Sequence, residues 1–330
     1  MSTEPDQGQA TAESGTVSSG ARGSVVSSAA LGGSGVGAGG CGSAASSAAL
    51  GGSGVGTGGC GSAASSAALG GLEVGTGDRG SAASSAATSN EWDGHAQWWQ
   101  REFTNGVDPE YTEQIIPIVL EHLEGRDQVL DIGAGEGQIA RALTQAGTAV
   151  VGLDPTMQQV LTARERAGGP VYAVSRSDHL PVPSACFDGA VACLVFEHID
   201  ALDESFAEVA RILRPGGRFV LIVNHPLLQT PNSGLIVDHM IDPPETYWRI
   251  GAYLQETETI EEINKGVHLR FVHRPLSRYL NGMIAVGLDL VAMLEPAPPP
   301  GFLVRAPEHE ADVAVNTPRL LALIGDRRQP

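Results

Sequence analysis

One stretch of the chain combines a carboxylate with glycines at alternate positions, a pattern suited to binding a nucleoside cofactor. Its four defining residues are Asp131, Gly133, Gly135 and Gly137. Glycine lets the backbone adopt positive φ angles and lets a ligand approach the main chain closely. Residues 129–132 are mostly apolar and strand-like, and residues 138–143 carry apolar side chains at helical spacing. The glycines are therefore predicted to lie in a turn between a buried strand and a helix.

The carboxylate distinguishes between two classes of nucleoside cofactor. A dinucleotide-binding loop has the spacing Gly-x-Gly-x-x-Gly, whereas position 138 of this chain is Gln138. A carboxylate two residues before the first glycine would repel a pyrophosphate, but it suits a cationic amino-acid group. Asp131 therefore favours S-adenosylmethionine over NAD.

The segment from Asp131 to Gly137 resembles the first motif of the class I S-adenosylmethionine-dependent methyltransferases. The resemblance implies cofactor contacts from Asp131, Gly133, Ala134, Gly135 and Gly137. The next predicted strand, residues 149–154, ends in Asp154, which in this family would accept hydrogen bonds from the ribose hydroxyls. The same residue could cap the helix that starts at Met157, and the two roles are compatible.

Residues 171–188 resemble the third strand and adenine loop of the family, with Leu180 as an anchor. Family members often carry an aspartate four residues before that leucine, where this chain has Arg176. We therefore assign adenine recognition to Ser177 or Asp178. Val195, near the end of the fourth strand, is a further expected cofactor contact.

The remaining pattern predicts an α/β fold with a Rossmann-like, doubly wound sheet of seven strands. Ligands in such open sheets bind beyond the carboxyl ends of the strands. Residues 213–219 resemble the turn before the fifth strand of the family. By the same resemblance, the last strand is antiparallel and lies inside the sheet. The later elements are expected at 187–198, 218–223, 288–294 and 319–324 for strands, and at 202–213 and 277–287 for helices.

The first 88 residues have a different composition from the rest of the chain. They are nearly all Gly, Ala, Ser, Thr and Val, and they contain a 19-residue repeat that starts at Ser24. Such a segment lacks the apolar side chains needed for a core, so we predict a disordered tail over 1–88. The methyltransferase domain is expected over 89–330, beginning near Ser89.

Two further segments are candidates for covering the cleft and selecting the acceptor. Residues 91–103 hold three of the four tryptophans and form either a lid over the cofactor or structural anchors for an N-terminal helix. Residues 226–275 form an insertion after the fifth strand, the region where the family varies with the acceptor. Tyr247, Trp248 and Tyr253 are its expected pocket walls.

Two histidines follow predicted strands at the ligand edge, His198 after the fourth and His225 after the fifth. A methyl sulfonium carries its own activation, so positioning dominates, but an oxygen acceptor benefits from a base. We predict His198 and His225 as the catalytic candidates, with His273 and Arg274 as further ones. The nine histidines show no compact metal-ligand spacing, and no metal is expected.

Charge and cysteine content limit the possible partners. The formal net charge is −18, which argues against a nucleic-acid substrate because such enzymes need basic surface. The four cysteines form neither a disulfide framework nor a zinc pattern. The sequence shows no secretory signal and no apolar run of transmembrane length, so a cytoplasmic protein acting on a small molecule is expected.

The most consistent interpretation is a small-molecule methyltransferase that uses S-adenosylmethionine. A catalytically silent binder of S-adenosylmethionine or S-adenosylhomocysteine, with a regulatory or scaffolding role, is the alternative. An NAD-dependent oxidoreductase is disfavoured by Asp131 and by the absence of a glycine at position 138.

Overall fold

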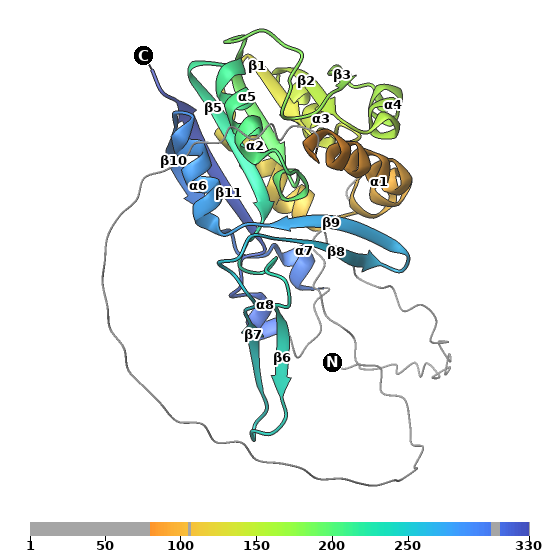
Figure 1. Cartoon of the computed structure of the whole chain (residues 1–330), viewed down its shortest axis with the longest axis vertical. Helices are drawn as coiled ribbons and strands as arrows, with labels where there is room; N and C mark the ends of the chain where they lie inside the picture. Colours follow the sequence, from red (N-terminus) through yellow and green to blue (C-terminus); the bar gives the residue numbers. More distant parts are fainter. Residues whose placement is uncertain (1–79, 105–106, 305–310, 330) are drawn as a thin grey trace, which may run out of the picture.

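Seven strands pair into one sheet in the order β10, β11, β5, β4, β1, β2, β3 (Figure 1). The computed structural model describes residues 80–104, 107–304 and 311–329. The strands of this sheet are β1 (Gln128–Ile132), β2 (Ala149–Asp154), β3 (Val171–Val174), β4 (Phe187–Cys193), β5 (Leu213–Asn224), β10 (Leu288–Leu294) and β11 (Leu320–Arg327). The predicted seven-stranded α/β sheet is confirmed.

The strand directions divide the sheet into a parallel part and an antiparallel part. Strands β3, β2, β1, β4 and β5 are parallel to one another. Strand β11 lies between β5 and β10 and is antiparallel to both. This arrangement confirms the prediction that the last strand is antiparallel and lies inside the sheet.

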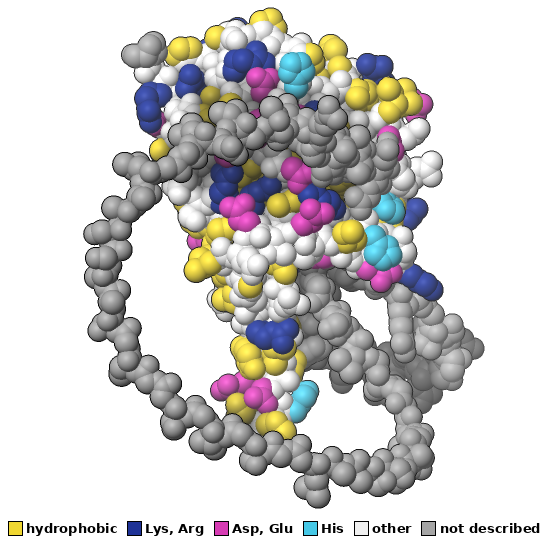
Figure 2. Space-filling view, viewed as in Figure 1, with side chains coloured by type: hydrophobic (Ala, Val, Ile, Leu, Met, Phe, Trp, Pro, Cys, Tyr) yellow, Lys and Arg dark blue, Asp and Glu magenta, His cyan; other side chains and the backbone are white. Residues whose placement is uncertain are grey.

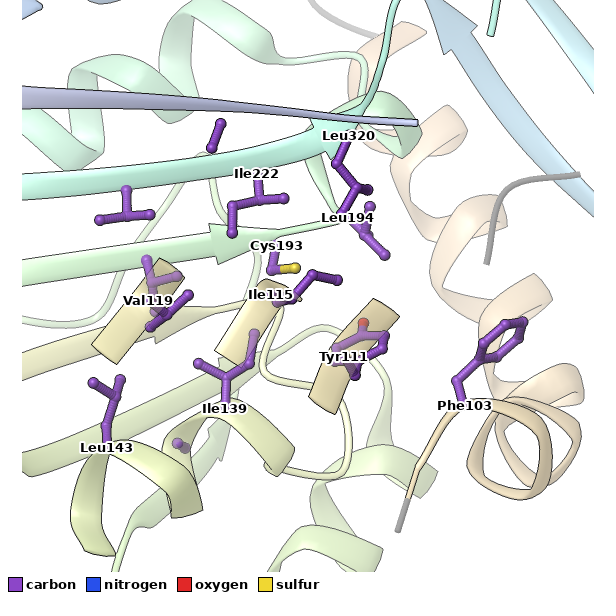
Figure 3. Packing of buried hydrophobic residues seen from close by; sticks show 14 of the residues in the cluster. Phe103, Tyr111, Ile115, Val119, Ile139, Leu143, Cys193, Leu194, Ile222 and Leu320 are labelled. Atoms are coloured by element: carbon purple, nitrogen blue, oxygen red, sulfur yellow. The ribbon is translucent and has the colours of Figure 1, made fainter. Parts of the chain in front are cut away.

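Helices cover both faces of the sheet, which is why its central strands are almost continuously apolar. The helical elements are α1 (Gly80–Phe103), the π-helix η1 (Tyr111–Ile115), α2 (Ile116–His122), α3 (Gln138–Gln145), α4 (Met157–Arg166), the 3-10 turn η2 (Phe196–His198), α5 (Leu202–Ile212), α6 (Leu276–Ala285), α7 (Pro300–Leu303) and α8 (Ala311–Ala314). Buried side chains of α1 to α4 form one core with one face, and those of α5 and α6 form a second core with the other. Figure 3 shows part of the first core, where Tyr111, Ile115 and Val119 face side chains of the sheet and of α3.

The insertion after β5 folds as two separate hairpins. One pairs β6 (Gly234–Asp238) with β7 (Glu245–Arg249), and the other pairs β8 (Thr257–Asn264) with β9 (Val267–His273). The β6–β7 hairpin projects from the domain, and Figure 2 shows hydrophobic side chains near its tip, where Met240 is 94% exposed. Residues of β9 instead contribute to the core that contains α1.

Two predicted boundaries differ from the structure. Strand β4 ends at Cys193 instead of continuing to His198, because Leu194 takes a positive φ of 55° and residues Phe196–His198 form a 3-10 turn. Helix α1 begins at Gly80, before the expected domain start at Ser89, in a run rich in alanine, the residue with the highest helix propensity. The rest of the predicted tail, residues 1–79, lies outside the described residues. Among the described helices, none has the length and apolar character that a bilayer crossing requires.

Candidate functional site

Two adjoining cavities lie beyond the carboxyl ends of β1, β2 and β4. The first cavity, of about 840 Å³, is lined mainly by the glycine turn, α1 and η1, and the second, of about 650 Å³, extends to residues 175–180. They share the lining residues Trp92, Gly133, Pro155, Val195, His198 and Ile199, and therefore form one continuous cleft. Its position at the carboxyl edge of a parallel sheet is the usual ligand position in open α/β folds.

The three glycines of the turn differ in what surrounds them. A Cβ atom on Gly133 would lie 2.2 Å from Cγ2 of Val195, and one on Gly137 would lie 2.1 Å from the Tyr172 hydroxyl. At Gly135, no heavy atom of the described residues lies within 4 Å of that position, so the turn is open to a ligand there. Gly133, Ala134 and Gly135 line the first cavity, whereas Gly137 packs against Tyr172 at the start of α3.

The two predicted acids at the strand ends both line the first cavity, and both are buried. Asp154 is bound by backbone groups: Gly135 N–H donates to its Oδ2 and Thr156 N–H to its Oδ1, each at 2.8 Å. Burial raises the pKa of Asp154, and these hydrogen bonds partly offset the shift. Its carboxylate is therefore fixed in place at the edge of the cleft.

Asp131 is held differently. Its Oδ2 atom is buried and has no hydrogen-bond partner among the described residues. Burial, with a smaller contribution from the nearby Asp154, raises the pKa of Asp131 to about 7. A buried carboxylate oxygen without a partner is costly, so this position is suited to a ligand that brings a cationic donor such as an ammonium group.

The second cavity contains the residues predicted to recognise adenine. Ser177, Asp178 and Arg176 all line it. Arg176 Nε donates to Asp178 Oδ1 at 2.8 Å, and this hydrogen bond lowers the pKa of Asp178. The Ser177 hydroxyl lies 2.8 Å from that of Ser205. Arg176, which replaces the usual family aspartate, thus holds an acid two residues later at the same cavity.

His198 lines both cavities. Its Nδ1 lies 2.7 Å from the carbonyl oxygen of Arg270, which can only accept, so Nδ1 carries the hydrogen and Nε2 is the unprotonated nitrogen. The ring lies between Trp92 and Phe271, at centroid distances of 5.0 and 4.6 Å. Burial, together with the nearby Arg270 guanidinium, lowers the pKa of His198 to about 4. The imidazole is therefore neutral at ordinary pH.

His225 lies elsewhere. Its Nε2 is 2.8 Å from Glu295 Oε1, and Leu227 N–H donates to its Nδ1. Its own backbone N–H donates to the carbonyl of Arg319 at 2.8 Å. These contacts connect the end of β5 with the segment after β10 and with the start of β11. In the described part of the chain, His225 is not among the residues that line the two cavities.

The tryptophan-rich segment contributes side chains to both the core and the cleft. Trp98 is 8% exposed and packs edge-on against Phe103 in the core. Trp92 and Trp99 instead line the first cavity with Tyr111, and their ring centroids are 5.6 Å apart. Sequence reasoning identified this segment but not Tyr111. Its position in a π-helix, an element frequent at functional sites, is set by tertiary packing and carries no local sequence signal.

Two arginines of the insertion bind the segment that lines the cleft. Arg274, which is 4% exposed, donates to the carbonyl oxygens of Phe196 and Ile199 at 3.0 and 2.6 Å. Arg270 forms an ion pair with Asp200. The β8–β9 hairpin and the residue after it therefore fix the segment 196–200 that lines the cleft.

The expected walls from the insertion lie at other places. Among the described residues, the linings of the two cavities do not include Tyr247, Trp248 or Tyr253. Tyr247 is on the projecting hairpin and 46% exposed, whereas the Tyr253 hydroxyl accepts a hydrogen bond from the backbone N–H of Leu276. No group of three His, Cys, Asp or Glu in the described ranges is placed to hold a metal ion.

Residues 130–221, which contain the glycine turn and most of the cleft, match the family model described as a methyltransferase domain. The chain is 36% identical over 90 residues to the malonyl-[acyl-carrier protein] O-methyltransferase of Pectobacterium atrosepticum, a match that covers 27% of this chain. It is 33% identical over 104 residues, 30% of this chain, to the demethylmenaquinone methyltransferase of Tropheryma whipplei. The matches span 36% and 43% of these two relatives, less than half of either.

A solved structure extends the similarity to the whole fold. The S-adenosylmethionine-dependent methyltransferase from Mesorhizobium loti superposes with a TM-score of 0.55 at 25% identity. The superposition covers 66% of this chain and 97% of that protein. With the seven-stranded sheet, the glycine turn and the acids at the strand ends, these similarities show that this chain contains a class I S-adenosylmethionine-dependent methyltransferase domain.

Proposed function

We propose that this protein transfers the methyl group of S-adenosylmethionine to a small-molecule acceptor. The observation that carries the proposal is the pair of buried acids at the cleft, Asp131 with an unpartnered oxygen and Asp154 fixed by Gly135. An ammonium group would satisfy Asp131, and ribose hydroxyls can donate to the remaining lone pairs of Asp154. The second cavity, with Ser177 and Asp178, then takes the adenine.

The residues of this chain would contribute positioning and exclusion of water. S-adenosylmethionine, when bound, supplies a methyl group that its positively charged sulfur already activates. Trp92 and Trp99 of α1 cover the first cavity together with Tyr111, and this apolar cover keeps water from the reacting atoms. Arg274 holds the carbonyls of the 196–200 segment, so that wall of the cleft keeps one geometry.

His198 is the proposed contact for the acceptor's nucleophilic group. With Nδ1–H donating to Arg270, the lone pair of Nε2 is available to accept a hydrogen bond from an acceptor hydroxyl or amine. A pKa near 4 makes this nitrogen a weak base, so its main effect is to orient the nucleophile. A catalytic role for His225 rests on the sequence pattern alone, because its ring is bound to Glu295.

The proposal is tested in two steps with the full chain. Calorimetry with S-adenosylmethionine and S-adenosylhomocysteine measures binding, and formation of S-adenosylhomocysteine in the presence of a small-molecule cell extract measures turnover. Binding and turnover together support the proposal. Stoichiometric binding without turnover of any acceptor would favour the silent-binder alternative, and tight NADH binding without S-adenosylmethionine binding would contradict both.

A further inference from the structure

The segment that carries His198 lies between β4 and α5. Residues 194–201 contain the 3-10 turn η2 and no strand, so the hydrogen bonds of the sheet do not fix the direction of the imidazole. Contacts with other elements must fix it instead. Strand β9 of the insertion supplies two such contacts from a single residue, Arg270.

Arg270 binds this segment with its main chain and with its side chain. Its carbonyl oxygen accepts the Nδ1 hydrogen of His198 at 2.7 Å. Its guanidinium forms an ion pair with Asp200, two residues further along the segment. Arg270 is only 8% exposed, so water competes little for these contacts. Two attachments from one residue, at positions 198 and 200, restrict both the place and the rotation of the segment.

The same guanidinium binds a second carboxylate, on the neighbouring strand β8. Glu258 Oε1 lies 2.6 Å from Arg270 Nε, and Glu258 Oε2 accepts a hydrogen bond from Nη2 at 2.7 Å. This ion pair lies within the β8–β9 hairpin, whereas Asp200 lies on the segment that carries His198. The two acids therefore bring the same charge to the guanidinium but connect it to different elements.

The contact at Nδ1 determines which form of the neutral imidazole is present. A neutral histidine carries its hydrogen on one of two nitrogens, and the hydrogen bond made by one nitrogen sets the state of the other. Because Nδ1–H is bound to a carbonyl, Nε2 keeps its lone pair, and the ring belongs to the lining of both cavities. With the hydrogen on Nε2, the ring would offer the acceptor a donor in place of a lone pair.

We propose that Arg270 is a positioning residue for methyl transfer, which keeps His198 in the Nδ1–H form and in one orientation. The inference rests on the proposed function, because it requires His198 to contact the acceptor. The guanidinium acts on His198 through Asp200 and not through Glu258. In the described structure Arg270 lies outside the linings of both cavities, so it would act on the acceptor only through His198.

Nitrogen NMR of the full chain, without any ligand, tests the positioning of His198. The resonances distinguish a protonated from an unprotonated ring nitrogen, and His198→Ala identifies those of His198. We expect the Nδ1–H form in the unmodified chain and in Glu258→Gln, and a mixture of the two forms in Arg270→Gln and Asp200→Asn. The Nδ1–H form in all of these proteins would overturn the proposal. The same mixture in Glu258→Gln would overturn it as well, because the guanidinium would then not act through Asp200.

Turnover, measured as formation of S-adenosylhomocysteine, tests the consequence for catalysis. Arg270→Gln should lower kcat about tenfold, because a misplaced contact slows the reaction. Glu258→Gln is the matched control: it breaks a pair whose glutamate is 54% exposed and should change kcat by less than about twofold. Asp200→Asn is the second variant if Arg270→Gln does not fold.

Calorimetry with S-adenosylhomocysteine separates positioning from cofactor binding, since Asp200 also lines the second cavity. We expect its affinity for Arg270→Gln to equal that for the unmodified chain. A parallel loss of affinity and kcat in this variant would mean that Arg270 supports the cofactor site, and the proposal would be wrong. If the NMR result is as expected but no acceptor is methylated, the proposed function fails while the control of His198 by Arg270 stands.

Discussion

The backbone N–H of Gly135 donates a hydrogen bond to Asp154 Oδ2 at 2.8 Å, so the glycine turn after β1 and the acid at the end of β2 are joined before any ligand binds. The two residues are 19 positions apart in the chain. Their contact orients one carboxylate oxygen toward the turn, and Thr156 fixes the other. The proposed cofactor site is therefore largely preorganised, which reduces the ordering that binding requires.

Replacement of Asp154 by alanine should weaken S-adenosylmethionine binding strongly. Loss of hydrogen bonds to a charged group costs roughly 1.5–3 kcal/mol, which corresponds to about 10- to 150-fold in Kd. Calorimetry measures the Kd of S-adenosylmethionine for the variant and for the unmodified chain. Asp188→Ala is the matched control, since Asp188 also accepts backbone hydrogen bonds, from Asp127 and Gln128, but at the opposite end of β1. Equal weakening by both variants would indicate a general loss of structure instead of a lost ribose contact.

Binding of S-adenosylmethionine should become tighter as the pH rises through about 7. The raised pKa of Asp131 means that its carboxyl is mostly protonated at pH 6 and ionised at pH 8, and only the ionised form attracts the ammonium group. We expect a Kd about tenfold lower at pH 8 than at pH 6. Asp131→Asn should remove this dependence. Glu197→Gln should preserve it, because Glu197 has a similarly raised pKa but does not belong to either described cavity lining.

The raised pKa of Asp131 also predicts how the stability of the ligand-free protein depends on pH. The folded-state pKa of Asp131 is raised from 3.8 to about 7, so the folded chain retains a proton that the unfolded chain releases. Its contribution to the free energy of unfolding is therefore present below about pH 4 and is lost as the pH rises to about 7. Asp131→Asn should raise the melting temperature at pH 8 and change it little at pH 4. An unchanged melting temperature at pH 8 would contradict the burial argument.

His198→Ala should reduce turnover by about 10²-fold, the lower end of the range for groups that assist proton transfer. Because the pKa of His198 is near 4, the turnover of the unmodified protein should show no step attributable to this histidine between pH 6 and 9. A rise in kcat centred near pH 6.5 that disappears in the variant would instead identify a conventional base. His225→Ala should lower the melting temperature through loss of the Glu295 contact while kcat is retained.

A chain that starts at Gly80 should match the full-length protein in melting temperature and S-adenosylmethionine affinity. The composition of the deleted residues does not supply the large apolar side chains of a core, whereas helix α1 begins at Gly80. Differential scanning calorimetry and binding titration provide the measurements. A melting temperature several degrees lower would mean that the repeat segment packs on the domain.

Much of the fold could be predicted because its signals are local. The strand, glycine turn and helix around Asp131, and the acid at the end of β2, are each encoded within a few residues. The end of β4 could not be predicted, because an apolar run does not reveal that Leu194 adopts a positive φ. Which tryptophan enters the core and which lines the cleft depends on how α1 packs, and consecutive residues Trp98 and Trp99 differ in this respect.

The site could be predicted less completely, because some contacts join distant parts of the chain. Arg274 binds carbonyl groups 75 and 78 residues earlier. Every residue has a backbone carbonyl, so the sequence does not indicate which ones the arginine binds. His225 follows a strand at the ligand edge as predicted, yet a glutamate 70 residues later binds its ring. The place of a residue after a predicted strand indicates that it lies at the ligand edge of the sheet. Tertiary packing then determines which of these side chains face the ligand.

The inner position of β11 determines the order in which the sheet can be completed during synthesis. Residues 320–327 follow every other strand of the sheet in the chain, yet β11 separates β5 from β10 and its residues 321–324 are fully buried. Until these residues leave the ribosome, β5 has an unpaired, apolar edge and β10 has no neighbour in the sheet. The nascent chain therefore exposes an unpaired strand edge at which aberrant strand pairing can occur.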